Sequence, residues 1–137
     1  MNIYEMTAEE YFAIAERDNK LCKVMEEYLP EEFAQASALF HMQQAIEKML
    51  KALWIINGKT PNPHNSLIYM LADSNVIKDA LPEELSEMDD TISLWEEAGY
   101  DINVPFDQDE YETAKRIYTS LKETAEKHLR KPWASVN

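Results

Sequence analysis

The chain has few residues that interrupt a helix. Only two glycines, Gly58 and Gly99, occur among 137 residues, and six prolines are the other helix breakers. Two isolated glycines exclude a glycine-rich phosphate-binding loop, which needs several of them close together. The long stretches without glycine or proline favour helices. No strand pattern competes, so the sequence predicts an all-α fold.

Cysteine and long apolar runs are also scarce. Cys22 is the only cysteine, which excludes an intramolecular disulfide and a cysteine-based zinc site. Its neighbours Leu21, Val24 and Met25 predict that the thiol is buried. No window approaches the ~20 consecutive apolar residues of a membrane span, and the first residues lack the pattern of a signal peptide. We therefore expect a cytoplasmic protein.

Acidic residues dominate the charge, with a formal net value of −13. This excess argues against direct binding to nucleic acid and against an anionic membrane surface. The charge is uneven, because six basic and only two acidic residues lie between Lys115 and Lys131. Two interpretations of this segment stay open. It is either a solvated helix face with cations near the C-terminal dipole or a docking face for an acidic partner.

The pattern of caps, breakers and apolar residues predicts five helices. Thr7 and Glu10 match a capping box, Asn57-Gly58 is a C-terminal signal, and Pro132 is expected to end the last helix. Short loops between long helices indicate an up-and-down antiparallel helical bundle, with four long helices plus one short helix, in a single domain spanning 1–137. The expected helices are about Thr7–Leu29, Glu31–Ile56, Ser66–Ala72, Pro82–Gly99 and Asp109–Leu129.

Apolar residues at helical spacing predict which face of each long helix is buried. On the first helix the predicted stripe is Phe12, Ala15, Cys22, Met25 and Leu29. On the second it is Leu39, Met42, Ile46, Met49, Leu50 and Leu53. On the last it is Tyr111, Ala114, Ile117 (or Tyr118), Leu121, Ala125 and Leu129.

Motifs for metal and acyl chemistry are absent from the sequence. None of the three histidines has a glutamate three residues before it, so the Glu-x-x-His pair of carboxylate-bridged metal bundles is missing. The H-E-x-x-H and G-x-S-x-G motifs are missing as well. We expect no metal and no cofactor.

One segment, from Phe40 to Leu53, carries a more specific pattern. Its Q-A-x-E-K-x-L-K-A run resembles the second-helix signature of the HEPN family (higher eukaryotes and prokaryotes nucleotide-binding). The A-E-R-D run at 15–18 and the His64-Asn65-Ser66-Leu67 run resemble further elements of that family. The resemblance implies a helical bundle that dimerises, with a polar cleft between the protomers. The matching signature residues are Gln44, Ala45, Glu47, Lys48, Leu50, Lys51 and Ala52.

Ribonuclease members of the family carry an R-x4–6-H motif, in which histidine acts as acid or base and arginine stabilises the phosphorane charge. Neither Arg17, Arg116 nor Arg130 is followed by histidine at the required positions. The sequence thus favours a protein that is not an enzyme, without deciding the question.

The candidate binding residues are a polar stripe on the second helix together with one loop histidine. The stripe members recur at three and four residues, so they share one helix face, roughly opposite Ile46 and Leu50. Three interpretations stay open: a solvated stripe, a polar network that orders the bundle, or the lining of a dimer or ligand groove. The candidates are Gln44, Glu47, Lys48, Lys51 and His64.

Three functional hypotheses follow. The first is a non-catalytic interaction module that forms a homodimer and acts with a partner. The resemblance implies a small nucleotidyltransferase as that partner, in a toxin–antitoxin-type system. The second is a divergent metal-independent ribonuclease that uses His64 and the Lys48/Lys51 stripe. The third is a bundle that binds a small ligand or nucleotide around Gln44, Lys48 and His64.

The remaining histidines have simpler expected roles. His41 is expected to be a partly exposed neighbour of the polar stripe. His128 is expected to be a cation favoured by the dipole at the end of its helix.

Overall fold

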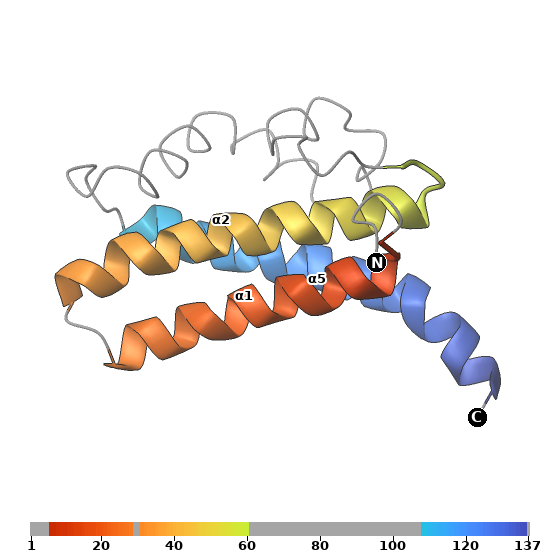
Figure 1. Cartoon of the computed structure of the whole chain (residues 1–137), viewed down its shortest axis with the longest axis horizontal. Coiled ribbons are helices and arrows are strands. Elements are labelled where there is room, and N and C mark those ends of the chain that lie inside the picture. The colour runs from red at the N-terminus through yellow and green to blue at the C-terminus, as the bar shows by residue number, and fades with distance from the viewer. Residues whose placement is uncertain (1–5, 29–30, 61–107, 137) are drawn as a thin grey trace.

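The computed structural model describes residues 6–28, 31–60 and 108–136, and within these ranges it contains three helices and no strand. They are α1 (Ala8–Tyr28), α2 (Glu31–Ile56) and α5 (Gln108–Val136), shown in Figure 1. This confirms the all-α prediction. The helices expected at Ser66–Ala72 and Pro82–Gly99, and the candidate His64, lie outside the described residues.

Helix α1 runs antiparallel to both α2 and α5 (Figure 1). Cys22 of α1 contacts Ala38 of α2. Asp18, one turn nearer the start of α1, contacts His41, which lies nearer the end of α2. Antiparallel pairing with α5 is shown in the same way, because Glu26 contacts Lys115 whereas Glu16 contacts Lys122. Helices α2 and α5 therefore run in the same direction.

The capping box at the start of α1 is confirmed. The Thr7 amide donates to Glu10 Oε1 at 3.0 Å, and the Glu10 amide donates to Thr7 Oγ1 at 3.1 Å. Each side chain thus satisfies a backbone N–H that the helix leaves without an internal acceptor.

The end of α2 is also as predicted. Gly58 has a φ of +83°, which permits the left-handed turn that follows the helix. The Gly58 amide donates to the Ile55 carbonyl at 3.0 Å, and the Lys59 amide donates to the Trp54 carbonyl at 2.9 Å. This pair of bonds is a Schellman motif, so the last carbonyls of α2 have donors.

The core lies where the three helices meet. The apolar stripes predicted for α2 and α5 are buried, except that Leu129 is only partly buried, and both Ile117 and Tyr118 face inward. On α1 the prediction was less accurate. Phe12 and Met25 are only partly buried, whereas Tyr11 and the charged Asp18 are buried. The buried residues of α2 from the predicted stripe are Leu39, Met42, Ile46, Met49, Leu50 and Leu53.

The prediction that Pro132 ends the last helix is wrong, because α5 continues to Val136. A proline lacks one N–H and crowds one carbonyl, so a helix passes it with the loss of a single backbone bond. His128 consequently lies two turns before the end of α5. The dipole acts within the last turn only, so it accounts neither for His128 nor for most of the basic segment. Among the described helices, none combines the length and apolar character needed to cross a membrane.

Candidate functional site

The polar stripe of α2 is folded largely into the protein. The Lys51 side chain is 1% exposed and that of Glu47 is 12% exposed, while Lys48 retains 23%. Gln43, which was not among the predicted candidates, is buried as well. A charged row with this little exposure is not a solvated stripe.

These side chains form one hydrogen-bonded network along α2. Gln44 Nε2 donates to Gln43 Oε1 at 2.9 Å, and Gln43 Nε2 donates to Glu47 Oε2 at 3.5 Å. The other oxygen of Glu47 lies 3.3 Å from Lys51 Nζ and 3.9 Å from Lys48 Nζ. Glu47 is therefore the centre of the network, because it receives contacts from two lysines and one amide.

Burial sets the electrostatics of this network. Burial lowers the pKa of Lys51, and the charge of Lys48 adds to this, while the Glu47 carboxylate acts in the opposite direction. The Lys51 ammonium also lies 5.9 Å from the ring centroid of Tyr11 on α1, a cation–π distance. Burial raises the pKa of Tyr11, and Glu47 raises it further. Glu47 thus supplies negative charge that favours the buried Lys51 ammonium.

A second polar contact joins α1 to α2. His41 Nδ1 lies 3.2 Å from Asp18 Oδ1, and Asp18 is buried while the histidine side chain is 26% exposed. A carboxylate at Nδ1 fixes the orientation of the imidazole and holds Nδ1 in its N–H form. The His41 ring also makes an edge contact with Phe40, at 5.5 Å between centroids. The expected partly exposed position of His41 is confirmed, and Asp18 is the partner that sequence reasoning missed.

The single cysteine is buried, as predicted. The Cys22 thiol donates to the Ala38 carbonyl at 3.3 Å. Burial raises the pKa of Cys22 to about 12, and the carboxylates of Glu26 and Asp18 contribute to the rise. A thiol with this pKa is not a nucleophile near neutral pH.

Ion pairs join α5 to α1 through two lysines of the basic segment. Lys122 pairs with Glu16, which also accepts a hydrogen bond from Tyr118 Oη at 3.0 Å. Lys115 Nζ lies 3.0 Å from Glu26 Oε1. These lysines have internal carboxylate partners, so they contribute little to a docking face for an acidic partner.

The structure brings four of the five predicted site residues together and leaves the fifth undescribed. Gln44, Glu47, Lys48 and Lys51 form the network on α2, while His64 lies outside the described ranges. No group of three or more potential metal ligands occurs in the part of the chain that the structure describes.

The described helices and the α2 network define an all-α helical domain with a partly buried polar face. The HEPN domain model matches residues 8–129, and the chain belongs to the HEPN family. No curated protein and no solved structure matches it with significance.

Proposed function

We propose that the chain is a non-catalytic HEPN interaction module, which self-associates and acts with a protein partner in a toxin–antitoxin-type system. The resemblance stated above suggests a small nucleotidyltransferase as the partner. The net charge of −13 supports docking on a basic protein surface, since complementary charge accelerates and orients association.

The observation that carries the proposal is the missing R-x4–6-H motif in a chain of this family. None of Arg17, Arg116 and Arg130 is followed by a histidine five to seven residues later, where the motif requires one. The described polar groups support the same view, because His41 contacts Asp18 and Lys51 contacts Glu47 inside the domain. These groups serve the packing of the helices.

Nucleotide binding is the second candidate, and the exposure of the α2 network favours it. Gln44 and Lys48 are only half-buried, at the edge of a network whose deeper members are enclosed. An amide and an ammonium on one helix face suit a phosphate or a base edge. A nucleotide bound only by the folded protein would raise the melting temperature by mass action.

The test of the proposed function is affinity capture of the tagged chain from its native cells, with the bound protein and nucleic acid both identified. A stoichiometric protein partner is the expected result. Capture of nucleic acid or nucleotide without a protein partner would contradict it.

Two purified-protein assays separate the alternatives. A melting-temperature rise with millimolar nucleotide, lost in Lys48→Gln and kept in the surface control Lys127→Gln, would favour the ligand-binding role. Metal-independent RNA cleavage that His64→Ala abolishes would favour the divergent ribonuclease. The interaction module predicts neither result.

A further inference from the structure

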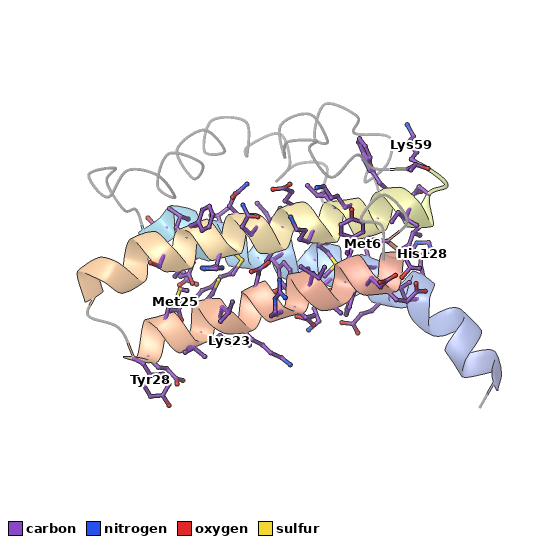
Figure 2. The ribbon with its side chains drawn as sticks, in the orientation of Figure 1. Met6, Lys23, Met25, Tyr28, Lys59 and His128 are labelled. Atoms are coloured by element: carbon purple, nitrogen blue, oxygen red, sulfur yellow. The ribbon has the colours of Figure 1, made fainter. Side chains whose placement is uncertain are left out.

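Helix α1 is attached to its two neighbours in different ways. It packs closely on α2 along its length, whereas few of its Cα atoms come near those of α5. Figure 2 shows Met25 between α1 and α2, while Lys23 and Tyr28 point away from α2. Helix α5 in turn packs more closely on α2 than on α1. The seam between α1 and α5 is therefore the least closely packed boundary among the three described helices.

Two groups of side chains bridge this seam, and each centres on a glutamate of α1. In the first group, which we call the Glu16 clamp, Glu16 accepts a hydrogen bond from Tyr118 Oη at 3.0 Å and pairs with Lys122. In the second group, the Glu26 clamp, Lys115 Nζ lies 3.0 Å from Glu26 Oε1. Long polar side chains of α5 thus span the distance that separates the two helix backbones.

The two clamps repeat one pattern on α5. Tyr111 precedes Lys115 by four residues, just as Tyr118 precedes Lys122. The two tyrosine–lysine pairs are seven residues apart, a spacing that places them on the same side of a helix. Burial raises the pKa of Tyr111, and the neighbouring Glu26 raises it further, so Tyr111 belongs to the Glu26 clamp. Helix α5 therefore presents one row of polar groups to α1.

Both ion pairs of the clamps are partly exposed to water. The side chains of Lys122 and Glu16 are 33% and 20% exposed, and those of Lys115 and Glu26 are 35% and 37% exposed. Ion pairs with this exposure are weak, and dissolved salt screens them. A change in charge or in ionic strength can therefore loosen the seam, whereas the packing of α1 on α2 does not depend on these pairs.

Cys22, the only cysteine of the chain, lies beside this seam. Its thiol is buried and donates to the Ala38 carbonyl of α2. Burial raises the pKa of Cys22, and among the smaller effects Tyr111 and Lys115 of α5 oppose the rise. The thiol is thus close to groups of all three described helices. Separating α5 from α1 would uncover it.

We propose that α5 is a strap held across α1 by the two clamps, and that the seam opens as a unit while α1 stays packed on α2. Opening exposes Cys22 to small reagents, and it becomes more frequent when the clamp charges are screened. Proteins open locally at a lower free energy than they unfold completely, and boundaries with few close contacts open first. The fold thus contains a conformational device that responds to ionic strength.

The test is the rate at which iodoacetamide labels Cys22 in the folded full chain, measured over a series of low urea concentrations. Opening of the seam alone exposes little surface, so the rate should rise with urea less steeply than complete unfolding does. Glu16→Gln and Glu26→Gln should each raise the rate about threefold to fivefold. Glu27→Gln, the same change at the next position of α1, should leave the rate unchanged, because Glu27 is exposed and belongs to neither clamp.

Salt and a second kind of variant sharpen the test. Raising the salt concentration from about 0.05 M to about 1 M should increase the labelling rate of the wild type severalfold, and the double variant Glu16→Gln/Glu26→Gln should lose this response. His41→Gln removes a contact between α1 and α2 and leaves the seam intact. It should lower the urea midpoint of complete unfolding without changing the labelling rate.

Each outcome decides one part of the inference. A labelling rate that follows urea as steeply as complete unfolding, or that rises in His41→Gln as far as stability falls, would overturn the strap. Equal rates in Glu26→Gln and Glu27→Gln, or a wild-type rate that ignores salt, would overturn the role of the clamps. None of these results depends on a protein partner, so the strap and the proposed function can fail separately.

Discussion

From the buried network on α2 we predict that replacing Glu47 lowers the stability of the fold substantially. In Glu47→Gln the shape of the side chain is kept, but Lys51, which is 1% exposed, loses the Glu47 carboxylate. Removing one member of a buried pair costs about 3–5 kcal/mol. We expect the lower end, about 3 kcal/mol, because Glu47 retains some exposure and the amide oxygen still accepts a hydrogen bond. For a chain of this length that is a fall in Tm of roughly 10 °C.

The matched control is Lys48→Gln, which removes a half-buried cation from the same carboxylate. Its pair with Glu47 spans 3.9 Å, so we expect a cost below about 1 kcal/mol. The measurement is urea unfolding of both variants and the wild type, followed by circular dichroism. Equal costs for the two variants would refute the account of Lys51 as a buried charge held by Glu47.

The loss in free energy of unfolding caused by Glu47→Gln, called the deficit below, should depend on pH, which provides a second check. Burial lowers the pKa of Lys51 in the folded chain and Glu47 opposes this, so the variant lowers it further. Between the lowered folded pKa of Lys51 and the unfolded pKa of lysine, the unfolded variant binds more protons than the folded one, so stability rises with pH over that range. The deficit relative to wild type should shrink as the pH is raised from 7 towards 10. A deficit independent of pH would contradict the mechanism.

Three further predictions concern Glu16, Cys22 and Gly58. Burial raises the pKa of Glu16, but hydrogen bonds from Lys122 and Tyr118 outweigh it, so the pKa lies below normal. Ionised Glu16 therefore contributes about 1 kcal/mol to the free energy of unfolding, a small value because the pair is partly exposed. This contribution is present above the pKa that Glu16 has in the unfolded chain, and it is lost as the pH falls through the lower pKa of the folded chain. Glu16→Gln should therefore flatten the acid arm of a stability–pH curve. Cys22 should react with iodoacetamide at pH 8 more than about a hundredfold slower in the folded than in the urea-unfolded chain. Gly58→Ala should cost about 1 kcal/mol by urea unfolding, because φ is +83° there; no loss would refute that strain.

Local signals in the sequence were sufficient for the helix ends that depend on neighbouring residues. The capping box at Thr7 and the turn at Gly58 each involve contacts within five residues, so the sequence contains the whole interaction. The apolar rows of α2 and α5 were likewise predictable from their spacing. Pro132 was misjudged because a single lost backbone bond does not decide where a helix ends.

The buried polar groups were harder to predict. Asp18 and His41 are 23 positions apart, and only the packing of α1 on α2 brings them to 3.2 Å. Lys51 and Glu47 are four positions apart, a spacing that suits an exposed pair as well as a buried one. Periodicity separates apolar from polar residues, and it therefore assigns a buried ion pair to the surface.

Native mass spectrometry of the tagged chain, captured from its own cells, tests the central claim most directly. The account predicts a particle containing two copies of the 16.0 kDa chain and a defined protein partner. A single copy without a protein partner, or a copy carrying only nucleotide or RNA, would contradict the interaction module.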